Sequence, residues 1–153
     1  MQASIGPSVY LLDQIRSVFE GLTLTVKGDT GGHQEIGYGH DLSPIERYPD
    51  GITLQFAELL LDEDMERCSE AVSKLGWTLN QGKVDALLDF TYECGAEALR
   101  ELAAHGQDQV PAQLPRWIHA NVDGKETVLP GMVKRRAAEV SWWNTVDPVA
   151  PGK

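Results

Sequence analysis

The hydrophobic pattern of the chain changes its period at Gly21, and this change limits what the first forty residues can form. Before it, apolar side chains recur at spacings of three and four, which predicts a helix over residues 8–19. After it, apolar and polar residues alternate over residues 22–27, which predicts a half-buried strand. Residues 28–32 have turn chemistry, so we expect residues 34–40 to return as a second strand.

A long helix is predicted next. Thr53 is a suitable N-cap, and the helical spacing of apolar residues continues to Leu75. Its apolar stripe consists of Ala57, Leu61, Met65, Cys68, Val72 and Leu75.

The remainder of the chain is predicted to be helical with one tight turn. Asn80 can cap a helix that ends at Cys94, and Asp123-Gly124 is a turn signal. Further helical segments are expected over residues 96–104, 112–120 and 131–143. The pattern therefore predicts an α+β fold in one domain spanning residues 1–153. Its parts are an N-terminal helix and sheet lobe (about 8–52), a connecting helix (about 53–75) and a helical lobe (about 76–145), with a cleft between the lobes.

Composition excludes several classes of protein. A hydrophobic fraction of 42% is too high for a disordered chain, and a net charge of −10 argues against nucleic acid as a partner. No apolar run is long enough for a membrane span, and residues 1–12 lack the pattern of a signal peptide. We therefore expect a protein that is cytoplasmic at synthesis, monomeric and not stably inserted in a membrane. Cys68 and Cys94 are expected to be buried free thiols.

Glu20 is the first candidate for chemistry. It stands at the end of the predicted first helix, where the negative end of the helix dipole disfavours a carboxylate. Apolar neighbours such as Phe19 and Leu22 would raise its pKa further, as a general acid requires. By itself, the position is more typical of an ordinary exposed glutamate.

Asp29 lies nine positions later, in the glycine-rich turn. A hairpin that folds back on the helix would bring the Asp29 and Glu20 carboxylates across a cleft, an arrangement that suits hydrolysis of a glycosidic bond. The alternative is an aspartate that only stabilises its own turn.

Asp64 falls on the apolar stripe of the long helix, and a buried charge needs a partner. His40, at the end of the second predicted strand, is the best candidate. A His40–Asp64 pair would fasten the sheet lobe to the long helix, unless Asp64 is simply solvated.

Other charged groups suggest no further chemistry. The four histidines lack metal-ligand spacing, so neither a metal nor another cofactor is expected. The run Lys134-Arg135-Arg136 is typical of a solvated helix face.

The stretch from Glu20 to His40 resembles the phage-type lysozymes of glycoside hydrolase family 24. It combines a helix-end Glu20-Gly21-Leu22, Asp29 in the next turn, and the closing motif Ile36-Gly37-Tyr38-Gly39-His40. Looser similarity continues at Gly51-Ile52-Thr53, at Tyr92-Glu93-Cys94-Gly95, at Trp117 and over residues 129–139.

The resemblance implies roles for individual residues. Glu20 matches the general acid, and Asp29 matches the carboxylate that orients or activates water. His40 and Asp64 match a buried structural pair. Residues implied to bind substrate are Tyr38, Tyr92, Glu93 and Arg136.

Two positions depart from the family pattern, and both add negative charge. Glu35 replaces the usual threonine that helps to hold the water, and Glu93 replaces an amide. Strand alternation puts Glu35 on the face of Gly37 and Gly39, where we expect it to enter the cleft as a third catalytic carboxylate. The alternative is a solvent-facing strand residue. With Glu35 in place of the threonine, the sequence does not decide whether hydrolysis retains or inverts the configuration of the anomeric carbon.

The function implied is that of a muramidase, which hydrolyses the β-1,4 bond between N-acetylmuramic acid and N-acetylglucosamine in peptidoglycan and lyses bacterial walls after release through a holin-type or other route. The bacterial wall is anionic and would repel so acidic a chain. This repulsion affects the rate of association and the adsorption to the wall more than the chemical step. The alternatives are a non-catalytic glycan-binding or structural protein of the same fold, and a transglycosylase.

Overall fold

In the computed structural model, which describes residues 5–28 and 33–145, the first helix changes from α to π geometry halfway along its length. Helix α1 (Val9–Gln14) continues into the π-helical segment η1 (Ile15–Phe19). The Ser8 hydroxyl caps α1 by accepting a hydrogen bond from the Leu11 amide. At the other end, the Glu20 amide donates to the Ile15 carbonyl, five residues back. The extent predicted for this helix is confirmed, and its second half is more loosely wound than expected.

The strands that follow form a three-stranded antiparallel sheet in the order β1-β2-β3, made of β1 (Thr23–Gly28), β2 (Gln34–Gly37) and β3 (His40–Asp41). The prediction of one strand over residues 34–40 is wrong, because the chain turns at Tyr38 and Gly39 and β3 pairs back onto β2. The turn needs positive φ angles at Gly37 (69°) and Gly39 (79°), which glycine adopts without strain.

Strand β1 is less buried than its alternating pattern predicts. Leu22 and Leu24 are 41% and 40% exposed, and Val26 is half-buried. The reason is that helix α2 packs mainly against β2 and β3, whereas β1 lies at the other edge of the sheet from β3. A hydrophobic pattern predicts a strand here but does not supply the layer that would cover it.

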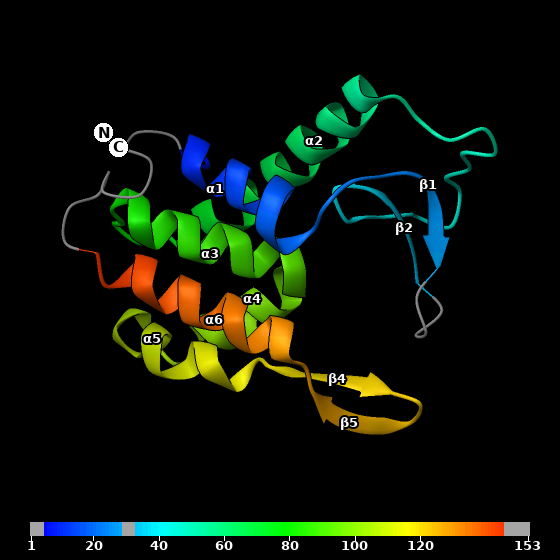
Figure 1. Ribbon diagram of the computed structural model, residues 1–153. Coiled ribbons are helices and arrows are strands. Elements are labelled where there is room, and N and C mark those ends of the chain that lie inside the picture. The colour runs from blue at the N-terminus through cyan, green and yellow to red at the C-terminus, as the bar shows by residue number, and fades with distance from the viewer. Residues whose placement is uncertain (1–4, 29–32, 146–153) are drawn as a thin grey trace.

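Helix α2 (Leu54–Ser73) connects the sheet to the other helices, as Figure 1 shows. The Thr53 hydroxyl accepts a hydrogen bond from the Phe56 amide, which confirms the predicted cap. The predicted stripe is confirmed from Ala57 to Val72, and Leu60 is buried with it. The helix ends at Ser73, so Leu75 lies beyond it and is half-buried.

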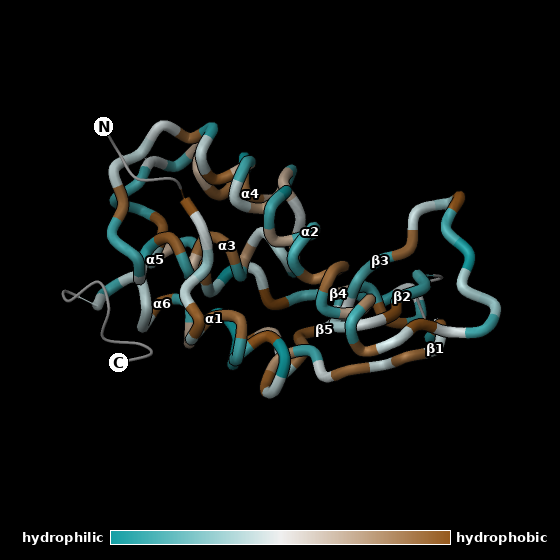
Figure 2. The backbone as a smooth tube through the Cα atoms, turned by 90° about the horizontal axis from the view of Figure 1, so that it is seen from above, coloured by the Kyte–Doolittle hydropathy of each residue, from teal (hydrophilic) through white to brown (hydrophobic). Residues whose placement is uncertain are grey.

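Helix α3 (Gln81–Cys94), capped by Asn80 as predicted, is the centre of the helical lobe. It packs against α2 on one side and against α6 (Pro130–Trp143) on the other. Helices α4 (Ala96–Ala103) and α5 (Val110–Gln113) complete the lobe with the short 3-10 segments η2 (Gln107–Gln109) and η3 (Leu114–Arg116). Figure 2 shows apolar and polar bands alternating along these helices, as expected of helices that bury one face.

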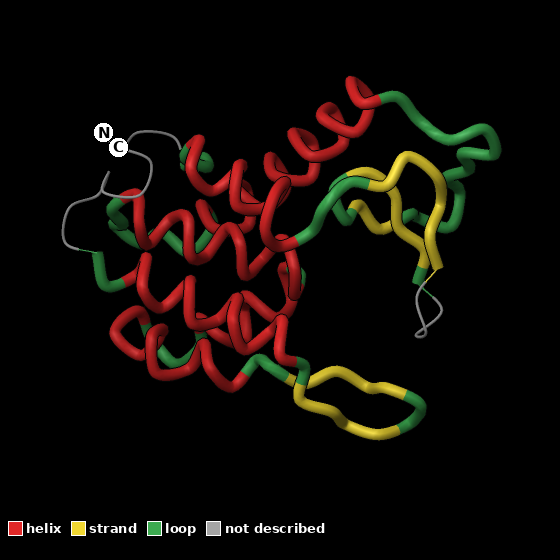
Figure 3. The backbone as a smooth tube through the Cα atoms, in the orientation of Figure 1, coloured by secondary structure: helices red, strands yellow, loops and turns green. Residues whose placement is uncertain are grey.

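A second, separate pair of strands replaces part of a predicted helix. The helix expected over residues 112–120 ends at Arg116, and the chain then forms β4 (His119–Val122) and β5 (Lys125–Val128). The Asp123-Gly124 turn is confirmed, with φ angles of 52° and 82°. In Figures 1, 2 and 3 this hairpin extends from the helices in the same direction as the β1–β3 sheet.

Two expectations from composition can be compared with the described residues. None of the helices described is both long and apolar enough to cross a bilayer. Both cysteines are free thiols, but only Cys68 is fully buried and Cys94 is half-buried.

A polar network around His40 connects the sheet to helix α2. His40 Nδ1 lies 2.7 Å from Asp64 Oδ2, and its Nε2 lies 2.9 Å from Glu46 Oε2. Arg67 forms a salt bridge with the other oxygen of Asp64. Asp64 is therefore paired, as a charge on the apolar stripe of a helix requires.

The network changes the pKa values of its members. The hydrogen bond to Asp64 is the largest cause that raises the pKa of His40 to about 9, against the opposing effect of burial. Burial favours a neutral Glu46, but hydrogen bonds from the Ser43 backbone, the Tyr48 hydroxyl and His40 hold its pKa at about 2. Because the pKa of His40 is raised, its charge stabilises the fold below pH 6.5, and this stabilisation is lost as the pH rises through about 9.

We predict that Asp64→Asn lowers the free energy of unfolding at pH 6 by about 3 kcal/mol, because a largely buried His40 loses its main counter-charge and keeps only Glu46. The difference from the unsubstituted protein should shrink above the His40 pKa. Urea unfolding at pH 6 and at pH 10 measures both effects. Glu63→Gln, which removes an exposed carboxylate from the same helix, is the control and should change little. Equal stability of Asp64→Asn and the unsubstituted protein at pH 6 would contradict this account.

Candidate active site

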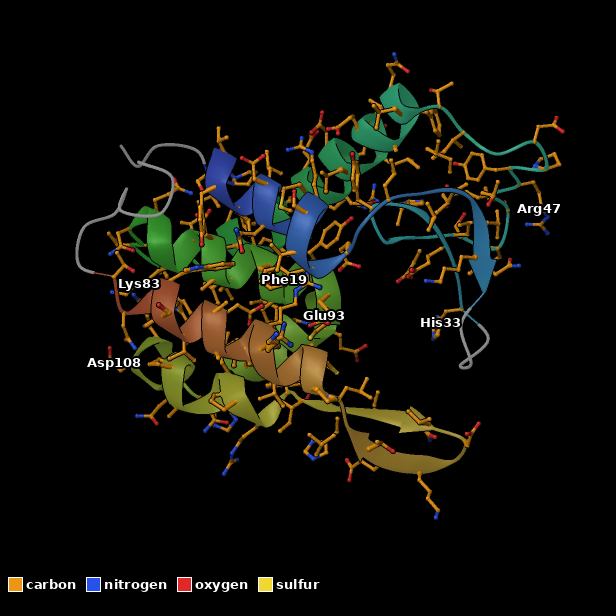
Figure 4. All side chains as sticks on the ribbon, in the orientation of Figure 1. Phe19, His33, Arg47, Lys83, Glu93 and Asp108 are labelled. Atoms are coloured by element: carbon orange, nitrogen blue, oxygen red, sulfur yellow. The ribbon has the colours of Figure 1, made fainter. Side chains whose placement is uncertain are left out.

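Glu20 follows the π-helical segment η1 and lies close to helices α3 and α6. Its Oε2 accepts a hydrogen bond of 2.6 Å from Arg135 Nη1 of helix α6, and its side chain is 18% exposed. Figure 4 shows neighbouring Phe19 and Glu93 of helix α3 close together at this end of the helices. Glu20 is thus shielded from water on most sides and still reachable from one.

The pKa of the Glu20 carboxyl is raised above its ordinary value. Burial is the largest cause, because it removes water from the charged form. The charge and hydrogen bond of Arg135 oppose this effect, whereas the negative charges of Glu93 and Glu35 add to it. The prediction of a raised pKa is confirmed, with burial as its main cause.

Gly39 leaves the space that the Glu20 carboxyl occupies. A Cβ atom at Gly39 would lie 2.5 Å from Glu20 Oε1, closer than any side chain tolerates. At Gly37, a Cβ would instead face Ala57 of helix α2. The absent side chain thus lets helix α2 approach at Gly37 and the Glu20 carboxyl approach at Gly39.

A pocket of about 480 Å³ is lined by Arg135 and Phe19, the partner and the chain neighbour of Glu20, but not by Glu20 itself. It lies between the end of η1, the end of α3 and the start of α6. Its lining residues are Val18, Phe19, Glu93, Leu129, Pro130, Gly131, Met132, Lys134 and Arg135. The mixture of apolar walls with a few charged groups is typical of a ligand site.

Asp29 and Glu35 are the two other predicted catalytic carboxylates. Asp29 lies outside the described residues. Glu35 is half-buried in β2, between Lys27 of β1 and Asp41 of β3 in the register of the sheet. Its neighbour Ile36 is completely buried, so Glu35 points to the opposite face of the strand, as alternation predicts.

Tyr38 and Tyr92 connect the sheet to the helices. The Tyr38 hydroxyl donates to Glu58 Oε2 of α2 at 3.0 Å, and Glu58 in turn accepts hydrogen bonds from Arg16. The Tyr92 hydroxyl donates to the Tyr38 carbonyl at 2.5 Å. Both hydroxyls therefore have partners within the protein.

Arg136 is not placed to contact a sugar, contrary to expectation. It is 1% exposed, and its Nη2 donates to Glu93 Oε1 at 2.6 Å and to Glu139 Oε2 at 2.8 Å. Arg135 is also buried, so the prediction of a solvated face fails for two of the three basic residues at 134–136. The physical reason is that buried carboxylates of α3 and α6 require these cations.

The sequence patterns did not identify Arg135, Asp89 and Glu139 as residues of the site. Asp89 interrupts an apolar run in α3, and a charge in such a run signals a buried partner. Arg135 and Glu139 stand four residues apart on one helix face. These patterns indicate that the charged side chains need partners, but they do not show which residues pair. Within residues 5–28 and 33–145, no group of three or more His, Cys, Asp or Glu residues could hold a metal ion.

Comparison with known proteins agrees with this architecture. Residues 17–139 match the phage lysozyme family. The chain is 31% identical over 128 residues to an endolysin of Acyrthosiphon pisum secondary endosymbiont phage 1, and the match covers 79% of this chain and 86% of the relative.

Two solved structures share the fold at similar identity. The muramidase domain of SpmX from Asticaccaulis excentricus is 31% identical, with a TM-score of 0.75 over 94% of this chain and 99% of that one. The endolysin from Escherichia coli O157:H7 phage FAHEc1 is 28% identical, with a TM-score of 0.77 over 94% and 96%. The expectation of a lysozyme-like α+β fold is confirmed.

We predict that Gly39→Ala displaces the Glu20 carboxyl from Arg135, because the added methyl group takes its place. Gly76→Ala is a matched control, since Gly76 has a similar φ of 69° and open space around it. Both variants should lose roughly 1–2 kcal/mol from backbone strain. Only Gly39→Ala should move the NMR signals of the Glu20 carboxyl and the Arg135 guanidinium. Unmoved signals would show that the contact is loose.

Proposed function

The chain belongs to the phage lysozyme family, and from this premise we propose that it is a muramidase. The bond hydrolysed is the β-1,4 glycosidic bond between N-acetylmuramic acid and N-acetylglucosamine in bacterial peptidoglycan. The relatives named endolysins and a muramidase domain support a wall substrate. In this proposal the protein acts on the wall after release from the cytoplasm.

The environment of Glu20 is the observation that carries the proposal. A general acid must hold its proton at the pH of the reaction and must be reachable by the leaving oxygen. Glu20 meets both needs, because burial raises its pKa and its carboxyl remains partly exposed. It also has a fixed position between Gly39 and Arg135.

Bond cleavage then begins with proton transfer from Glu20 to the glycosidic oxygen. Positive charge develops on the sugar as the bond breaks, and a carboxylate nearby stabilises it. Asp29 is our candidate for this carboxylate and for activation of the attacking water. Tyr38, Tyr92 and Glu93 are retained as candidate substrate contacts, through backbone or ring surfaces in the case of the two tyrosines.

Glu35 adds a second carboxylate whose role depends on distance. Its charge is close enough to raise the pKa of Glu20, which supports a position near the acid. A separation of about 5–5.5 Å from the acid favours direct attack on the sugar and retention, whereas roughly 6.5–9.5 Å leaves room for water and inversion. We favour a base that assists Asp29, and the alternative is a solvent-facing strand residue.

We predict that Glu20→Gln abolishes lysis and leaves the fold intact, because the amide has nearly the same shape but cannot donate the proton. Clearing of a suspension of permeabilised Gram-negative cells measures the activity. In the unsubstituted protein, lysis should fall as the pH rises through the Glu20 pKa, since only the protonated acid is active.

The matched control is Glu97→Gln, which removes an exposed carboxylate from α4 and should lyse normally. Normal lysis by folded Glu20→Gln protein would remove Glu20 from its role. An unsubstituted protein that binds wall material without cutting it would favour the non-catalytic alternative. Products that lack the added water, seen by mass spectrometry, would identify a transglycosylase.

We predict that Glu35→Thr preserves or improves hydrolysis, because it restores the residue that the family uses to hold water. Glu35→Gln should impair hydrolysis if the carboxylate has become the base, since the amide cannot accept the proton. Lysis rates of both variants, with the anomeric form of the first product followed by NMR, decide the role. Rates equal to the unsubstituted protein in both variants would make Glu35 a bystander.

A further inference from the structure

Glu20 belongs to a cluster of charged side chains that are linked by salt bridges. It joins the end of η1 to helices α3 and α6. Its members are Glu20, Asp89, Glu93, Arg135, Arg136 and Glu139. Asp89 and Glu139 are completely buried, and the two arginines are 3% and 1% exposed. Charges this deeply buried must nearly balance one another.

Arg135 is held rigidly by Asp89. Its Nε donates to Asp89 Oδ2 at 2.9 Å and its Nη2 donates to Asp89 Oδ1 at 2.8 Å, a two-pronged pair. The guanidinium also lies over the Phe19 ring, 4.7 Å from its centre. Nη1 remains, and it lies 2.6 Å from Glu20 Oε2 and 3.6 Å from Glu93 Oε2. Two carboxyl groups thus share one nitrogen of a fixed cation.

Glu93 also pairs with the second arginine. Its Oε1 accepts a 2.6 Å hydrogen bond from Arg136 Nη2, while its Oε2 faces Arg135. Glu93 therefore bridges both guanidinium groups. It is the one member of the cluster for which the family pattern has a neutral amide.

The protonation of the two deepest carboxyl groups follows from their surroundings. Burial favours a neutral Asp89, but the charge of Arg135 and hydrogen bonds from Glu139 and Arg135 hold the pKa of Asp89 below its ordinary value. Burial, together with the hydrogen bond to Asp89, raises the pKa of Glu139 well above its ordinary value. These surroundings favour the charged form of Asp89 and the neutral form of Glu139, and the charge and hydrogen bond of Arg136 oppose the latter effect.

The charges then balance without Glu20. The positive charges of Arg135 and Arg136 are matched by Asp89 and Glu93, so the cluster has no cation left over for a third carboxylate. With an amide in place of Glu93, Arg135 would keep Asp89 as its partner but would lose the second negative charge 3.6 Å from its Nη1. The attraction of Arg135 for an ionised Glu20 would then be less offset.

We propose that Glu93 is a positioning residue which, by bridging Arg135 and Arg136, satisfies the second positive charge of the cluster and so keeps Glu20 in its neutral, proton-donating form. The proposal rests on the role of Glu20 as general acid under the proposed function. Under this proposal, a glutamate at position 93 instead of the family's amide changes the chemistry of the site, because Glu93 acts on Glu20 through Arg135.

Other charged or titratable groups face Glu20 from the described elements. Glu35 of β2 adds negative charge and favours a neutral Glu20. Tyr92 of α3 stays neutral, because burial and the nearby Asp64 and Glu20 charges raise its pKa. The Tyr92 hydroxyl donates to the Tyr38 carbonyl, whereas the salt bridges of Arg135 join it to Glu20, Asp89 and Glu93.

The test is to remove the charge of Glu93 and follow the titration of Glu20. In the full chain with ¹³C-labelled glutamate, the Glu20 carboxyl signal is assigned by its loss in Glu20→Gln. Glu93→Gln should lower the midpoint of the Glu20 titration by roughly one pH unit. The alkaline limb of the lysis rate should move to lower pH by the same amount.

Two controls separate this effect from others. Glu93→Asp keeps the charge and should leave the midpoint close to that of the unsubstituted protein. Glu97→Gln removes one exposed negative charge from the neighbouring helix and should also leave it unchanged. If Glu93→Gln does not fold, Glu93→Asn removes the same charge with a smaller side chain.

An unchanged Glu20 midpoint in a folded Glu93→Gln or Glu93→Asn protein overturns the proposal. So does a variant that changes only KM, because Glu93 would then act only as a sugar contact and not through Glu20. The titration needs no substrate, so a protein that fails to lyse cells contradicts the proposed function while the midpoint still decides the role of Glu93.

Discussion

The buried pair between Asp89 and Arg135 is the interaction on which the rest of the site depends. Neither side chain could remain charged in the interior alone, so helices α3 and α6 must pack with these two groups in contact. The two-pronged geometry leaves one guanidinium nitrogen, and that nitrogen meets Glu20. A structural necessity of the helical lobe thus fixes the position of the proposed catalytic acid.

The sheet approaches the same point from the other side. Gly39 gives the Glu20 carboxyl its space, and the next residue, His40, is bound to Asp64 and Glu46. The turn at residues 38–39 is therefore held between the acid and helix α2. The π-helical end of the first helix brings Glu20 into this narrow position. Packing and polar contacts together leave the carboxyl little freedom, which suits a group that must donate a proton in one direction.

Local sequence patterns correctly predicted the features that depend on interactions between neighbouring residues. The caps at Thr53 and Asn80, the stripe of α2 and the turn at Asp123-Gly124 are all visible in a few neighbouring residues. Predictions were wrong where distant parts of the chain decide. Residues 119–120 belong to a hairpin instead of a helix, and Leu24 stays exposed because helix α2 packs mainly against the other two strands of the sheet.

The sequence by itself determined the α+β class, the order of the main elements and the candidacy of Glu20, since each is written in hydrophobic period, caps and a local motif. It also showed that Asp64 would need a partner. Only the tertiary structure decided that Arg135 and Arg136 are buried and that Glu93 bridges them. The physical reason is that burial and pairing of charges depend on contacts between α3, α6 and η1. These segments are far apart in the chain, and no local pattern encodes their distances.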